Sequence, residues 1–136
     1  MLVVIQIAIT MIFEHFAVSV ADIKATVKWY VNHLGLIVVS EQKEAPFMNF
    51  LADATGRVII EFYHRPDAVI TDFNKEHPLT FHVAFVSENV QRDRERLEKQ
   101  GAVYVEEINK EDGTHIVMLR DPFGMPLQLC QRAVKF

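Results

Sequence analysis

FEHFAVSV, residues Phe13–Val20, is the stretch that decides the expected fold, because a related stretch, LTFHVAFVSEN, occurs at Leu79–Asn89. His15 of the first stretch and His82 of the second are 67 residues apart. Each stretch alternates polar and apolar residues over a short distance, which is typical of a half-buried strand. A recurrence at fixed spacing indicates a duplicated structural unit.

Two further pairs of residues share this spacing. Glu61, in RVIIEFYH, lies 67 residues before Gln128, in MPLQLCQ. Asp22 and Asn89, which follow the two quoted strands, are separated by the same distance. Both are residue types that cap the first turn of a helix, so a helix is expected after each strand. The duplication therefore extends beyond the first strand of each unit.

The elements expected along the chain run strand–helix–strand–strand–strand, twice. We therefore predict an α+β protein built from paired βαβββ modules. The predicted modules are residues 13–66 and residues 80–132, joined by a linker at 67–79. Residues 1–12 are expected to form an N-terminal extension, either a strand or an interface segment, and residues 133–136 a C-terminal tail.

Composition bounds the class of protein. The chain has 136 residues, half of them hydrophobic and about a quarter charged, which is ordinary for a soluble globular domain. A net charge of −4 argues against nucleic-acid binding, which needs a basic face. The apolar N-terminal run lacks a basic region and is too short to span a bilayer, so we expect no membrane association. Cys130 is the single cysteine, which favours a reducing, cytoplasmic location.

Strand alternation places four candidate metal ligands on the sheet faces that no helix covers. Ile60 and Phe62 belong to the apolar face of their strand, so Glu61 points the opposite way. A carboxylate in such an apolar strand is costly to bury without a partner, and a metal ion is one such partner. The four candidates are His15, Glu61, His82 and Gln128.

The double βαβββ order, a histidine at each first strand, Asp22 before a helix with Trp29-Tyr30, and the run DPFGMPLQL resemble the vicinal oxygen chelate superfamily. This group includes glyoxalase I, bleomycin-resistance proteins, fosfomycin-resistance enzymes, methylmalonyl-CoA epimerase and extradiol dioxygenases. The resemblance covers nearly the whole chain, and it implies that two cupped mixed sheets enclose a divalent metal site. The metal positions of the family map onto His15, Glu61, His82 and Gln128.

One departure from the family pattern bears on the chemistry. The last metal ligand of the family is commonly a glutamate in a DPxGN-x-x-E run, whereas this sequence has Gln128 there and Met125 in place of the asparagine. Glutamine can ligate through its carbonyl oxygen but cannot act as a base. The catalytic base is therefore expected to be Glu61. The sequence does not distinguish among Zn, Ni, Mn, Fe and Mg.

Three functions remain open at this point. The first is a metal-dependent lyase, isomerase or dioxygenase acting on a small-molecule substrate, which the family resemblance implies if the four ligands bind a divalent ion. The second is a metal-free binding protein of the bleomycin-resistance type, and the third is a non-catalytic interaction protein. Family members often form homodimers, which we expect here. The candidate substrate-binding residues, which could equally be ordinary sheet or core residues, are Tyr63, Met118 and Cys130.

Overall fold

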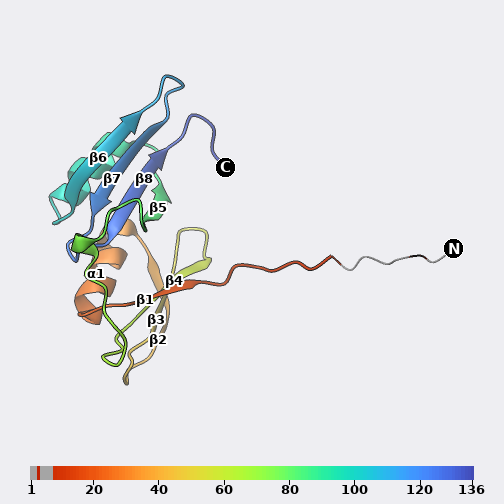
Figure 1. The fold of residues 1–136 in the computed structure, drawn as a ribbon, viewed down its shortest axis with the longest axis vertical. Helices are drawn as coiled ribbons and strands as arrows, with labels where there is room; N and C mark the ends of the chain where they lie inside the picture. Colours follow the sequence, from red (N-terminus) through yellow and green to blue (C-terminus); the bar gives the residue numbers. More distant parts are fainter. Residues whose placement is uncertain (1–2, 4–7) are drawn as a thin grey trace. The chain divides into compact units, whose positions relative to one another are not determined.

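The computed structural model describes residue 3 and residues 8–136, which divide into two compact units, one ending at Asp67 and the other starting at Ala68. Figure 1 shows that each unit consists of one sheet with a helix. The elements of the first unit are β1 (Phe16–Ser19), α1 (Ile23–Leu34), β2 (Ile37–Glu41), β3 (Asn49–Ala52) and β4 (Val58–Tyr63).

The second unit repeats this order after a short 3-10 helix. Its elements are η1 (Phe73–Lys75), β5 (Val83–Val86), α2 (Val90–Glu98), β6 (Val103–Asn109), β7 (His115–Arg120) and β8 (Pro126–Gln131). The predicted linker thus contains one turn of helix, which begins after Asp72, whose side chain accepts a hydrogen bond from the Asn74 amide. The predicted α+β class with paired βαβββ modules is confirmed.

Both sheets have the same topology. Their strand orders are β1-β4-β3-β2 and β5-β8-β7-β6. The β1–β4 and β5–β8 pairs are parallel, and the other neighbouring strands are antiparallel. Ala17 lies opposite Glu61 in the first sheet, and Ala84 lies opposite Gln128 in the second. These partners are related by the 67-residue spacing, so the duplication in the sequence is also a duplication of strand register.

The helices begin at equivalent caps. The Asp22 side chain accepts a hydrogen bond from the Ala25 amide at 3.0 Å, and the Asn89 side chain accepts one from the Arg92 amide at 3.0 Å. Each satisfies an amide that the first turn of the helix leaves unbonded. Cap and helix start therefore recur with the strand register, and they fix where each helix leaves its sheet.

Each helix covers one face of its own sheet. In the first unit Tyr30 of α1 packs its ring against Phe62 of β4, with centroids 4.9 Å apart, and both side chains are fully buried. In the second unit the fully buried side chains include Leu97 of α2 and Leu127 of β8. Because neighbouring residues of a strand point to opposite faces, Glu61 and Gln128 lie on the faces away from the helices.

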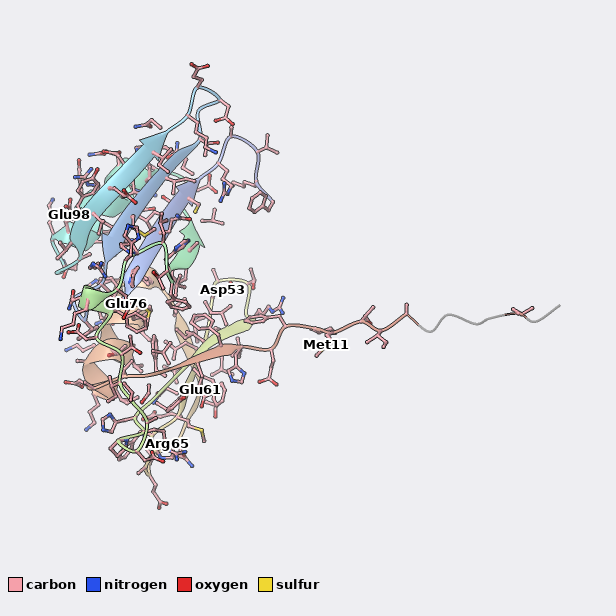
Figure 2. The ribbon with its side chains drawn as sticks, in the orientation of Figure 1. Met11, Asp53, Glu61, Arg65, Glu76 and Glu98 are labelled. Atoms are coloured by element: carbon pink, nitrogen blue, oxygen red, sulfur yellow. The ribbon has the colours of Figure 1, made fainter. Side chains whose placement is uncertain are left out.

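The structure describes only part of the predicted N-terminal extension. Residues 1–2 and 4–7 of the predicted extension lie outside the described residues, and the described residues before Phe16 form no strand. They continue from β1 as an extended arm (Figure 1), on which Met11 is 93% exposed (Figure 2). Within the described part of the chain, neither sheet includes a strand from the arm. Its alternative role as an interface segment remains a prediction.

Among the described residues, neither helix has the length and apolar character that crossing a bilayer would require.

Candidate functional site

Glu61 is the buried charged residue of the first sheet. It lies in the middle of β4, between Ile60 and Phe62, which point toward α1. Glu61 is only 8% exposed, although it faces away from the helix, and Figure 2 labels it within this sheet. A carboxylate so far removed from water requires hydrogen-bond donors or a cation.

His15 supplies the partner. It immediately precedes β1, and its Nε2 atom lies 3.0 Å from Oε2 of Glu61. The His15 ring also meets the ring of Phe50 edge to face, with centroids 5.2 Å apart, and Phe50 lies opposite Glu61 in the β3–β4 pair. The other ring nitrogen, Nδ1, lies 2.6 Å from Oε1 of Glu14. The imidazole is therefore held on three sides.

This arrangement suits a metal-binding pair. An imidazole nitrogen and a carboxylate oxygen are ligands for divalent first-row metals, and here they converge to hydrogen-bond distance. Histidines that bind metals usually give their second ring N–H to a carboxylate or carbonyl, and Glu14 lies where it would accept that hydrogen. The donor set in the first unit therefore fits the metal that the fold implies.

The residues at the corresponding positions of the second unit are His82 and Gln128. His82 immediately precedes β5, as His15 precedes β1, so both predicted strand histidines lie just outside their strands. The Nδ1 atom of His82 lies 3.1 Å from the Pro78 carbonyl oxygen, which can only accept a hydrogen bond. Nδ1 therefore carries the hydrogen, and in the neutral ring Nε2 is the nitrogen available as a ligand.

The Gln128 side chain has a hydrogen-bond partner within its own strand. Its Oε1 atom accepts a hydrogen bond from the Cys130 thiol at 3.2 Å. Cys130 is 7% exposed, and burial raises the pKa of its thiol, an effect that Arg132 partly opposes. The thiol therefore acts as a hydrogen-bond donor and not as a thiolate nucleophile. It holds the Gln128 amide on the sheet face away from α2.

The other predicted site residues lie on the same faces. Met118 is directly opposite Gln128 in the β7–β8 pair and is 3% exposed. Tyr63 lies two residues beyond Glu61 in β4, opposite Ser19 of β1. Their role in substrate binding remains a prediction. Within the described part of the chain, no three His, Cys, Asp or Glu side chains form a metal-binding cluster.

Comparison with known proteins identifies the family. The sequence model of the Glyoxalase/Bleomycin resistance protein/Dioxygenase superfamily matches residues 12–129. The chain belongs to this superfamily. No curated protein matches the chain. The resemblance inferred from the repeated histidines, the helix caps and the DPFGMPLQL run is thus confirmed.

Several solved structures of the superfamily fold resemble the chain. TnmS3, an antibiotic binding protein from Streptomyces sp. CB03234, is 19% identical with a TM-score of 0.67, covering 93% of this chain and 98% of its own. A possible glyoxalase from Bacillus cereus is 20% identical with a TM-score of 0.65, covering 90% and 100%. A glyoxylase/bleomycin resistance protein/dioxygenase domain from Frankia sp. EAN1pec is 17% identical with a TM-score of 0.65, covering 90% and 92%. At these identities the likeness shows the fold alone.

Two residues of the site were missed by the sequence analysis. Phe50 could have been found, because its alternation with the buried Leu51 in β3 places it on the face of Glu61. Glu14 had no such signal. It precedes the strand, and its contact with His15 depends on side-chain orientation that periodicity does not determine.

Proposed function

We propose that this chain is a divalent-metal-dependent enzyme that acts on a small, oxygen-rich molecule. The proposed ligands are His15 and Glu61, with His82 and Gln128 as the second pair. The observation that carries the proposal is the contact of 3.0 Å between His15 Nε2 and the buried Glu61 carboxylate, on the sheet face free of the helix. A buried carboxylate next to an imidazole is a frequent feature of catalytic and metal sites.

Each residue of the proposed metal site has a separate role. When bound, the divalent ion would supply Lewis acidity toward two adjacent substrate oxygens. His15 is oriented by Glu14, so that its Nε2 atom faces the site. His82 is oriented by the Pro78 carbonyl in the same way. Glu61 is the proposed proton acceptor, because Gln128 cannot take up a proton.

Substrate binding is proposed on the same sheet faces. Tyr63 offers a hydroxyl and a ring, while Met118 offers a flexible apolar surface beside Gln128. Cys130 contributes by holding the Gln128 amide. The reaction type, whether lyase, isomerase or dioxygenase, depends on which substrate these groups admit, since the fold alone supports all three.

A second candidate function is metal-free binding of a small molecule, as in bleomycin-resistance proteins. One specific observation favours it: the Gln128 oxygen that would ligate a metal is already bonded to the Cys130 thiol. One structural relative, TnmS3, is an antibiotic binding protein. In this alternative His15 and Glu61 form an ordinary hydrogen bond in the wall of a pocket.

We also propose that the protein is a cytoplasmic homodimer. Ile9, Met11 and Ile12 of the arm are each at least 90% exposed. A run of exposed apolar side chains is stabilised when another protein surface covers it. The free thiol of Cys130 suits a reducing compartment.

Metal content and affinity separate the two functions. The test is elemental analysis of the purified protein, followed by calorimetric titration of the chelator-treated protein with Zn²⁺, Ni²⁺ and Mn²⁺. Wild type is expected to take up one of these ions stoichiometrically, and Glu61→Ala and Glu61→Gln are each expected to abolish uptake. Glu44→Ala, an exposed carboxylate of the same unit, is the matched control and should bind normally. Absence of stoichiometric binding by wild type would refute the enzyme proposal and favour metal-free binding.

A further inference from the structure

A pocket lies in the first unit, at the point where the chain enters α1. It has a volume of about 520 Å³, and its walls come from residues 21–24, from residues 41–43 at the end of β2, and from Phe47, Asn49 and His64. We propose that this pocket binds a free amino acid with an apolar side chain, such as an aromatic amino acid. The proposal is independent of the metal site and of the reaction proposed above.

The pocket lies on the other side of the sheet from Glu61. Asn49 is directly opposite Phe62 in the β3–β4 pair, and directly opposed residues point to the same face. Phe62 packs against Tyr30 of α1, so this is the helix side of the sheet. Glu61, next to Phe62 in β4, points the other way. A ligand in the pocket would therefore be separated from the His15–Glu61 pair by the sheet.

The charges in the wall are balanced. Lys24 and Lys43 provide two ammonium groups, while Asp22 and Glu41 provide two carboxylates. Lys43 and Glu41 pair with each other at 2.8 Å, and among the described residues Lys24 has no ion-pair partner. Asp22 uses its Oδ1 atom for the Ala25 amide, which leaves Oδ2 for another donor. Lys24 and Asp22 thus offer one site for a carboxylate and one for an ammonium group.

The polar side of the pocket also has an oriented imidazole. The Nδ1 atom of His64 donates to the Val20 carbonyl at 2.6 Å, and the His64 amide donates to the Pro46 carbonyl at 2.9 Å. Because a carbonyl oxygen only accepts, Nδ1 keeps its hydrogen and the Nε2 atom is left for a ligand. His64 therefore adds a further polar contact, held in place by the residue that follows β1 and by the loop before β3.

The apolar side is the ring of Phe47. This residue has a backbone φ of 57°, which residues other than glycine rarely adopt, and it is 41% exposed. Its amide donates to the Glu44 carbonyl and its carbonyl accepts from the Asn49 side chain, so the loop holds the ring at the pocket. An exposed ring held in place offers a stacking surface for an apolar side chain.

The pocket volume falls within the range of ordinary small-molecule sites. Wall groups of opposite charge suit a zwitterion better than a simple anion or cation. A ligand with one charge would be attracted by one of these wall groups and repelled by the other. The Phe47 ring adds a preference for an apolar side chain. An amino acid combines a carboxylate, an ammonium group and such a side chain in one small molecule.

The test uses three probes that share a phenylethyl skeleton and differ in the charged groups it carries: phenylalanine with both groups, 3-phenylpropionate with the carboxylate alone, and 2-phenylethylamine with the ammonium group alone. Each is titrated into the full-length ¹⁵N-labelled protein at fixed salt, and binding is followed by amide chemical shifts. Phenylalanine is expected to bind saturably, with shifts concentrated at residues 21–24, 41–43 and 47–49, and at least about tenfold more tightly than either single-charge probe. Saturable binding of 3-phenylpropionate as tight as that of phenylalanine would refute a zwitterion site, as would no binding.

Three variants and two control variants locate the site. Lys24→Gln and Asp22→Asn are each expected to weaken phenylalanine binding about tenfold, and asparagine keeps the helix cap. Phe47→Gly removes the ring, suits the positive φ, and is expected to weaken binding about fivefold. Lys28→Gln, one turn further along α1, and Glu61→Gln, on the other sheet face, should bind as wild type does. Equal weakening by Lys24→Gln and Lys28→Gln would refute the proposal, because only net charge would then be acting.

Discussion

The Nε2 atom of His15 lies 3.0 Å from the Oε2 atom of Glu61, whose side chain is only 10% exposed. This contact joins the residue before β1 to the middle of β4. It satisfies a buried carboxylate in the metal-free protein, and it brings together two groups that a metal ion could share. It therefore contributes to stability as well as to the proposed site.

His15→Ala is expected to destabilise the metal-free protein by about 1–3 kcal/mol at pH 7, because Glu61 then loses its buried partner. Urea unfolding of the chelator-treated protein measures this. Adding Glu61→Gln to His15→Ala should recover part of the loss, since an uncharged amide is less costly to bury. The two side chains do not interact if the double variant is less stable than His15→Ala by as much as Glu61→Gln alone is less stable than wild type.

Asp22→Ala and Asn89→Ala are each expected to lower the free energy of unfolding by about 1 kcal/mol, because each removes the acceptor for one amide of a first helical turn. Urea unfolding provides the measurement. Asp22→Asn and Asn89→Asp exchange the two cap residues and serve as controls, with expected losses within about 0.5 kcal/mol. A loss at only one of the two positions would argue against equivalent caps in the two units.

Much of the fold could be predicted because its signals are local. Strand alternation and the cap residues Asp22 and Asn89 revealed the duplication, and the structure shows it as equal register at Ala17–Glu61 and Ala84–Gln128. The same alternation correctly placed Glu61 and Gln128 away from the helices. These features depend on neighbouring residues in the chain, which a single sequence displays directly.

Other features depend on distant partners and could not be predicted. His15 and His82 precede their strands instead of lying within them, because a strand begins only where a neighbouring strand is present to pair. The contacts of Glu14 with His15 and of Cys130 with Gln128 depend on side-chain rotamers. The pocket beside Phe47 requires a loop conformation with positive φ that no sequence pattern indicated.

Acid is expected to weaken a polar network in the second unit. A hydrogen bond from His115 holds the pKa of Glu107 below its ordinary value of 4.5, helped by hydrogen bonding from Tyr104 and by the charge of Arg94. Because the folded pKa lies below the unfolded one, the ionised carboxylate stabilises the fold above about pH 4.5, and this contribution is lost as the pH falls through the folded pKa.

Glu107→Gln should therefore be less stable than wild type at pH 7, and the difference should shrink as the pH is lowered from 5 toward 3. Urea unfolding of both proteins across this range gives the comparison. Glu111→Gln, an exposed carboxylate of the turn before β7, is the control and should show little difference from wild type at any pH. A difference between Glu107→Gln and wild type that stays constant with pH would contradict the prediction.

Gln128→Glu is expected to tighten divalent metal binding by about tenfold or more, because it replaces a neutral amide ligand with a carboxylate. Calorimetric titration of the chelator-treated protein measures the change. The new carboxylate can still accept the hydrogen bond from the Cys130 thiol, so the fold should be retained. Asn109→Asp makes the same amide-to-carboxylate change at an exposed position of β6 and should leave metal affinity unchanged. Unchanged affinity in Gln128→Glu would place Gln128 outside the metal site, leaving His15, Glu61 and His82 as the proposed ligands.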